Sequence, residues 1–192
     1  MRKILNIYEN PIDDILIDIS EYLCPYFKKC SMTPNNITTL SLITGVLSIF
    51  FLYHNYFIWT IIYLFLSYFF DIVDGHFARK YKMETEFGDL YDHIKDIIVN
   101  FCIFFLLMYK TYIIDKKLMY IYFFIIIFFY ICMNFHLGCQ ERMYDNKENN
   151  NFLHYNTYLC KKKEYIKYSR YVGCATFYLV VFILIFILKS YY

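Results

Sequence analysis

The chain has 192 residues, which is enough for one domain, and 59% of them are hydrophobic and 23% aromatic. A soluble core of this size cannot bury so many large side chains, so the composition argues against a soluble domain and predicts helices that border lipid. The net charge is only +2 and the Lys and Arg residues are spread over several connecting segments, so no nucleic-acid partner is expected.

The cysteines also exclude some classes of site. They are seven in number, which is odd, and they form no C-x-x-C pair. Several of them lie within apolar runs, so the pattern suggests neither a zinc site nor a disulfide framework. We therefore expect reduced thiols.

Residues 1–32 are predicted to form an amphipathic juxtamembrane segment. Between Pro11 and Cys24, apolar residues recur at helical spacing among acidic ones, as in a helix that lies on a membrane surface. Pro25 and the basic pair that follows are predicted to end this helix. Thr33 followed by Pro34 has the pattern of a helix cap with a first-turn proline.

Apolar segments follow that are each close to the ~20 residues that a helix needs to cross a bilayer. They are residues 37–55, 57–79, 88–109, 117–137 and 170–190. The polar stretch from Gln140 to about Tyr168 is the one long connection, and a sixth helix hidden within it stays open. The predicted fold class of residues 33–192 is therefore all-α: a polytopic integral membrane bundle of about five to six transmembrane helices.

Basic residues gather in the connections at one end of this predicted bundle. By the positive-inside rule this end and the amino terminus face the cytosol. A few lysines at the opposite end weaken this asymmetry without reversing it. The residues at the basic end are Arg2, Lys3, Lys28, Lys29, Arg79, Lys80, Lys82, Arg142, Lys147, Lys161, Lys162, Lys163 and Lys167.

Carboxylates interrupt the second and third apolar segments: Asp71, Asp74, Asp92 and Asp96. An ionised carboxylate in a spanning helix costs ~3 kcal/mol or more, so such a group needs cations or water nearby. The spacing within each pair places both carboxylates on one face of their helix. If the two helices pack antiparallel, the pairs face each other and form an oxygen-rich pocket that suits Mg²⁺ or Mn²⁺.

The residues around these carboxylates suit a phosphate-bearing ligand. Gly75 and Ala78 remove side-chain bulk about one turn apart, which lets a ligand or a neighbouring helix approach the backbone. Arg79 adds a cation that can hold phosphate oxygens in bidentate fashion. Gly88 opens the next helix, again without bulk.

In chain order the residues read Asp71-x-x-Asp74-Gly75-x-x-Ala78-Arg79, eight residues, then Gly88-x-x-x-Asp92-x-x-x-Asp96. This pattern resembles the signature of the CDP-alcohol phosphatidyltransferase family at every fixed position. Upstream, Pro34-Asn35-Asn36-Ile37-Thr38 resembles the Pro-Asn-x-x-Thr that commonly starts the first helix in that family. The resemblance covers about residues 33–100, where the catalytic core is expected.

The resemblance implies a membrane transferase of phospholipid biosynthesis, in which an acceptor alcohol attacks a CDP-alcohol and CMP leaves. By carry-over, Asp71, Asp74 and Asp92 hold Mg²⁺ or Mn²⁺, as two ions on the donor pyrophosphate, and Asp96 is the catalytic base. The implied substrate-binding residues are Gly75, Ala78, Arg79 and Gly88, with Asn35 and Thr38 as further nucleotide contacts. The resemblance is compatible with a homodimer and, in a eukaryote, with the endoplasmic reticulum.

Several functions stay open at this point. Asp92 followed by His93 resembles the choline and ethanolamine phosphotransferases, which favours a CDP-aminoalcohol donor and a diacylglycerol acceptor. The alternative within the family is transfer from CDP-diacylglycerol to a small polar alcohol such as inositol or glycerol phosphate. The alternative of another class is a small cation channel or transporter, because intramembrane aspartates also bind ions. That alternative leaves Arg79 and the small residues beside it unexplained. A catalytically inactive relative is a further alternative.

Overall fold

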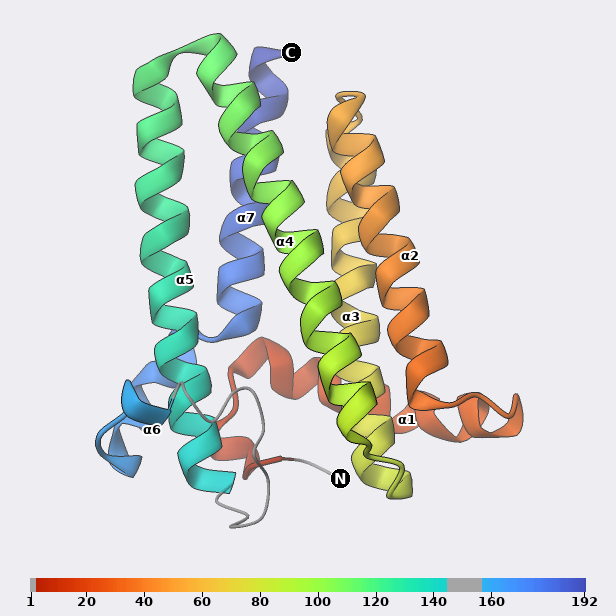
Figure 1. The fold of residues 1–192 in the computed structure, drawn as a ribbon. Coiled ribbons are helices and arrows are strands. Elements are labelled where there is room, and N and C mark those ends of the chain that lie inside the picture. The colour runs from red at the N-terminus through yellow and green to blue at the C-terminus, as the bar shows by residue number, and fades with distance from the viewer. Residues whose placement is uncertain (1–2, 145–156) are drawn as a thin grey trace.

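The computed structural model describes residues 3–144 and 157–192, which form helices and turns without strands. Long helices run side by side along one axis, and helix α1, Pro11–Lys29, crosses one end of them (Figure 1). The predicted all-α fold class is confirmed. Arg2 and Lys147, counted above among the basic residues, lie outside the described residues.

Within the described residues, five helices are long and apolar enough to cross a membrane. They correspond to the five predicted spans, so that prediction is confirmed. The fourth span, Lys116–Met143, is longer than predicted, and the fifth, Lys163–Tyr191, joins short helical turns to the last helix. The helices are α1 Pro11–Lys29, α2 Pro34–Tyr53, α3 Phe57–Tyr81, α4 Glu86–Ile114, α5 Lys116–Tyr144, α6 Ile166–Ser169 and α7 Cys174–Leu188. Single 3₁₀ turns span Asn6–Tyr8, Lys163–Tyr165, Arg170–Val172 and Lys189–Tyr191.

The polar stretch before α7 begins later than predicted, because α5 continues through Gln140 to Tyr144. The last turns of α5 are held by the amino-terminal segment: Gln140 Nε2 donates a hydrogen bond to Glu9 Oε2 at 2.9 Å. The described residues from 157 onward contain only short helices before α7, and none of these alone reaches spanning length.

Cys139 and Cys160 form a disulfide, contrary to the expectation of reduced thiols. Both cysteines are buried in a small apolar cluster with Ile4 and Ile166. The fold brings the end of α5 beside the segment that precedes α6, and the spacing of the two cysteines in the sequence carries no sign of that. The other five cysteines are free, as expected.

Helix α1 lies across the end of the bundle where α3 ends and α4 begins (Figure 1). One face packs on the bundle through the buried residues Leu16, Ser20 and Cys24. The opposite face exposes a helical series of large apolar side chains, as does a helix that lies in the surface of a membrane. This series is Ile12, Ile15, Ile19, Tyr22 and Tyr26.

Helix α1 was predicted to end at Pro25 and the basic pair that follows; it continues through Pro25 and ends at Lys29, the second residue of that pair. A proline inside a helix leaves the carbonyl group four residues earlier without its amide partner. Here that carbonyl belongs to Glu21, and it accepts a hydrogen bond from Lys80 Nζ of α3 at 3.3 Å. The neighbouring helix therefore replaces the missing bond, which explains why α1 continues through the proline.

The predicted start of α2 is confirmed. Thr33 is the cap, its hydroxyl accepts a hydrogen bond from the backbone N–H of Asn36 at 3.3 Å, and Pro34 is the first helical residue. At the start of α4, Thr85 Oγ1 accepts a hydrogen bond from the backbone N–H of Gly88 at 3.0 Å. Both caps satisfy amide groups that the first helical turn leaves without partners.

Helix α2 packs against both α3 and α4. They approach closely at Gly45 of α2, where an added Cβ would lie 2.8 Å from Val99 Cγ2 of α4 and 3.0 Å from Ser67 Oγ of α3. Such a short distance leaves no room for a side chain, so glycine permits this contact between the three helices. At the end of the bundle away from α1, α4 and α7 pack around a core that includes Leu107 and Ile185.

Candidate active site

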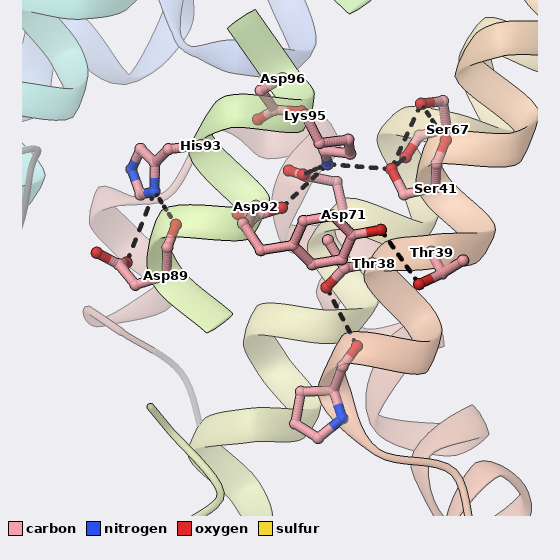
Figure 2. A network of polar contacts seen from close by, with 12 residues as sticks. Thr38, Thr39, Ser41, Ser67, Asp71, Asp89, Asp92, His93, Lys95 and Asp96 are labelled. Carbon is pink, nitrogen blue, oxygen red and sulfur yellow. Dashed lines mark hydrogen bonds and ion pairs between the residues drawn. The ribbon is translucent and has the colours of Figure 1, made fainter. Parts of the chain in front are cut away.

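Two helices supply the four aspartates of the site. Asp71 and Asp74 lie in the second half of α3, and Asp92 and Asp96 lie in the first half of α4. Helix α3 ends and α4 begins at the same end of the bundle (Figure 1), and Asp71 lies beside Asp92 and Asp96 between these helices (Figure 2). One carboxylate oxygen from each of Asp71, Asp74 and Asp92 lies within 4.8 Å of the other two.

The carboxylate of Asp74 is buried and is not fully satisfied by hydrogen bonds. Asp74 is 4% exposed, and its Oδ2 atom has no hydrogen-bond partner among the described residues. A buried oxygen of this kind is destabilising unless a cation or a donor satisfies it. A divalent ion bound by Asp71, Asp74 and Asp92 would do so, and Mg²⁺ and Mn²⁺ favour carboxylate ligands. The residues present therefore fit a hard divalent ion.

Lys95 of α4 lies at the centre of the site and was not among the predicted residues (Figure 2). Its side chain is 1% exposed, and its ammonium group pairs with Asp71, with Asp96 Oδ1 at 2.8 Å and with Asp92 Oδ1 at 3.0 Å. The contact with Asp92 is an ion pair without hydrogen-bond geometry. A signal existed in the sequence, because a lysine within a spanning helix needs a partner as much as an aspartate does.

Two serines join this site to α2. Lys95 Nζ donates a hydrogen bond to Ser41 Oγ of α2 at 3.1 Å. Ser41 Oγ donates to the backbone oxygen of Ser67 of α3 at 2.8 Å, and Ser67 Oγ donates to the backbone oxygen of Ser41 at 2.8 Å. These buried bonds tie α2, α3 and α4 together beside the carboxylates.

Beyond Asp74, α3 carries the predicted residues Gly75, Ala78 and Arg79. A Cβ added at Gly75 would lie 3.3 Å from Arg79 Nη1, so the guanidinium group lies over this glycine, one turn back along the helix. The backbone oxygen of Ala78 accepts a hydrogen bond from the N–H of Met83 at 2.9 Å where α3 ends. The missing side chain at Gly75 thus leaves room for the guanidinium group.

The remaining predicted residues lie where α2 and α4 begin. A Cβ added at Gly88 would lie 3.0 Å from Asn35 Oδ1, so the structure brings these two residues together. Thr38 is 2% exposed, and its hydroxyl donates to the backbone oxygen of Pro34 at 3.1 Å. Thr38 is therefore bonded to its own helix (Figure 2).

Acidic residues of α1 also reach this end of the bundle. Glu21 accepts a hydrogen bond from Lys80 Nζ at 2.5 Å and contacts His76, and these bonds lower the pKa of Glu21 to about 2. Asp13 accepts a hydrogen bond from the hydroxyl of Tyr68, while its burial raises its pKa to about 6. Both residues attach α1 to α3.

Comparisons with known proteins extend the sequence pattern to most of the chain. A protein of Aquifex aeolicus (strain VF5) described as "Uncharacterized protein" is 35% identical over 79 residues, which are 41% of this chain and 40% of that protein. No solved structure was found to match. The sequence model of the family described as CDP-alcohol phosphatidyltransferase matches residues 31–191, which include all four aspartates. Because that match covers far more than half of its residues, the chain belongs to the CDP-alcohol phosphatidyltransferase family.

Proposed function

We propose that this protein is a divalent-metal-dependent membrane phosphotransferase that transfers the substituted phosphate of a CDP-alcohol to an acceptor alcohol and releases CMP. One observation carries the proposal: carboxylate oxygens of Asp71, Asp74 and Asp92 lie within 4.8 Å of one another in a chain of this family. Family membership supports transfer of phospholipid head groups in a membrane. The donor, the acceptor and the metal dependence are proposals.

Three aspartates are proposed to hold the metal. Bound to Asp71, Asp74 and Asp92, Mg²⁺ or Mn²⁺ would supply positive charge next to the donor pyrophosphate. The protein's part is to hold these carboxylates in place on two helices that also pack against α2. The bonds between Ser41 and Ser67 support that placement.

Asp96 is proposed to be the base. Its side chain is 40% exposed, more than that of Asp71 or Asp92, so an alcohol can reach it. Asp96 takes the proton of the acceptor hydroxyl while that oxygen bonds to the phosphorus distal to cytidine. The bond between this phosphorus and the bridging oxygen breaks, and CMP leaves with the bonding electrons.

The donor is proposed to bind along the ends of three helices. Arg79 holds phosphate oxygens, and the missing side chain at Gly75 leaves room for its guanidinium group. Thr38 is the weaker candidate, because its hydroxyl is already bonded within α2. The proposed contacts are Gly75, Ala78 and Arg79 of α3, Gly88 of α4, and Asn35 and Thr38 of α2.

The finer assignments remain proposals. Asp92 followed by His93 favours a CDP-choline or CDP-ethanolamine donor with diacylglycerol as acceptor, and CDP-diacylglycerol with a small polar alcohol is the alternative. The basic residues at the α1 end favour a cytosolic active site, in the endoplasmic reticulum of a eukaryote. The homodimer also remains a prediction.

The test is release of CMP by the purified protein in lipid, with Mg²⁺ or Mn²⁺. CDP-choline, CDP-ethanolamine and CDP-diacylglycerol are offered separately with mixed acceptors. We expect metal-dependent release from one donor, reduced on the order of 10²-fold or more in Asp71→Asn. The matched control is Asp89→Asn, which changes a carboxylate that is 41% exposed near the start of α4 and should leave release unchanged.

Two outcomes would contradict the proposal. The first is a folded, metal-binding protein that releases no CMP from any donor. The second is full turnover in Asp71→Asn, which would remove this residue from the proposed mechanism. Metal-dependent cation flux into liposomes that contain the protein, without CMP release, would favour the channel alternative.

A further inference from the structure

The four aspartates form two triads that overlap. The first triad, Asp71, Asp74 and Asp92, has its oxygens within 4.8 Å of one another and is the candidate metal site. The second triad, Asp71, Asp92 and Asp96, surrounds the ammonium group of Lys95. Asp71 and Asp92 belong to both triads (Figure 2), so a cation bound by the first triad would lie next to the ammonium group.

The second triad is already filled by a cation that belongs to the chain. The Lys95 side chain is 1% exposed, so carboxylates replace the water that surrounds an ammonium group in solution. Ser41 Oγ, at 3.1 Å, adds a neutral oxygen. The contacts with Asp71 and Ser41 are hydrogen bonds and those with Asp92 and Asp96 are ion pairs, so the charge of the ammonium group is paired within the site. A metal ion can enter the second triad only if it displaces a buried ammonium group that has no other partner among the described residues.

The balance of charges in the site also favours a single divalent ion. Ionised, the four aspartates carry four negative charges, and Lys95 supplies one positive charge. A single divalent ion leaves the site with one negative charge. A second divalent ion would make the site positive. It would also lie against the ammonium group, because both bind the shared carboxylates of Asp71 and Asp92.

We propose that Lys95 takes the place of a second metal ion, so that this site binds one divalent ion on Asp71, Asp74 and Asp92 beside a fixed ammonium group. This inference departs from the two ions that the family resemblance implies, and it rests on the proposed metal site. During transfer, Lys95 then holds Asp96 in place and supplies a positive charge that does not depend on the concentration of metal.

The experiment counts the ions with Mn²⁺ alone, in the full chain reconstituted in lipid nanodiscs, by equilibrium binding and by electron paramagnetic resonance. Wild-type protein is expected to bind one Mn²⁺ with the spectrum of an isolated ion. Lys95→Met is expected to bind two Mn²⁺, a twofold rise, with the spectrum of a coupled pair about 4 Å apart. Lys95→Arg keeps the positive charge and is expected to bind one.

The matched control is Lys110→Met. Lys110 is also a buried lysine of α4, but it lies near the other end of the helix and donates to the backbone oxygen of Tyr53 at 3.2 Å. This variant is expected to bind one Mn²⁺. If Lys95→Met does not fold, Lys95→Gln takes its place. This variant also removes the charge but keeps a hydrogen-bonding group, and it is likewise expected to bind two Mn²⁺.

Either of two results would overturn the inference: a coupled pair of ions in the wild-type protein, or a single ion in the folded neutral variants of Lys95. CMP release is measured on the same wild-type sample. Release from a protein that binds two ions overturns the inference and leaves the proposed function intact. No release from any donor, with one ion bound in wild type and two in Lys95→Met, supports the inference and contradicts the proposed function.

Discussion

Replacing Asp13 by asparagine is expected to stabilise the docking of α1 at neutral and alkaline pH. Asp13 is 8% exposed, accepts a hydrogen bond from the hydroxyl of Tyr68, and lies with Oδ2 3.5 Å from the backbone nitrogen of Ala175. Burial raises its pKa from 3.8 to about 6, and the two hydrogen bonds oppose this rise only in part. The ionised carboxylate is therefore unfavourable in the folded state.

The size of the effect follows from this pKa. A shift of about two units corresponds to about 3 kcal/mol. Between pH 3.8 and about 6 the folded state binds more protons than the unfolded state, so stability is greatest below that range and falls as pH rises through it. Asparagine avoids the charge but loses the acceptor for Ala175, which costs about 1 kcal/mol. We expect Asp13→Asn to gain about 2 kcal/mol at about pH 8 and to lose about 1 kcal/mol at about pH 4.

The assay is thermal unfolding in one detergent over this range of pH, where 1 kcal/mol shifts the midpoint by about 2–4 °C. Asp18→Asn changes an exposed acidic residue of the same helix and is the matched control. A midpoint of Asp13→Asn that is equal to or below that of the wild type at about pH 8 would refute the reasoning. So would a difference between the two proteins that does not change with pH.

Three further predictions follow from the packing and the charges. Gly45→Ala places a methyl group 2.8 Å from Val99 Cγ2 and should destabilise the protein by about 1–3 kcal/mol in thermal unfolding; an unchanged midpoint would contradict this. Gly88→Ala places a methyl group 3.0 Å from Asn35 Oδ1 and should raise the KM for the CDP donor on the order of tenfold with a smaller effect on kcat; an unchanged KM would remove this contact from the donor site. Because the pKa of Glu21 is lowered from 4.5 to about 2, the stability that its ionised form provides is present above pH 4.5 and lost as pH falls through about 2. Its side chain is 50% exposed, so Glu21→Gln should cost only about 1 kcal/mol near neutral pH, measured as the difference in unfolding midpoint; a difference that persists at about pH 2 would contradict this.

The spanning helices and the aspartate pairs could be predicted because each depends on local sequence. An apolar run near the length of a bilayer crossing predicts a helix, and the spacing of Asp71 and Asp74 predicts a shared face. The short connection to α4 then brings Asp92 to the same end of the bundle. The structure agrees with each of these steps.

The features that were missed depend on partners far away in the chain. The continuation of α1 through Pro25 needs Lys80 of α3 to satisfy the carbonyl group of Glu21. The disulfide between Cys139 and Cys160 needs the fold to bring the two segments together. Lys95 is different, because its position between Asp92 and Asp96 in a spanning helix was visible in the sequence, and its need for anionic partners could have been recognised.

The position of α1 across the end of the bundle also indicates how deep in the bilayer the carboxylates of the candidate site lie. If α1 lies at the membrane surface, its contacts between Glu21 and His76 and between Asp13 and Tyr68 mark that surface on α3, on either side of Asp71. Asp71 is five residues from His76, a rise of about 7.5 Å along the helix. The carboxylates would then lie at the depth of the glycerol backbones of the lipids, well above the middle of the bilayer. A lipid hydroxyl could meet Asp96 without leaving its leaflet, while a water-soluble CDP-alcohol needs to descend by less than two helical turns.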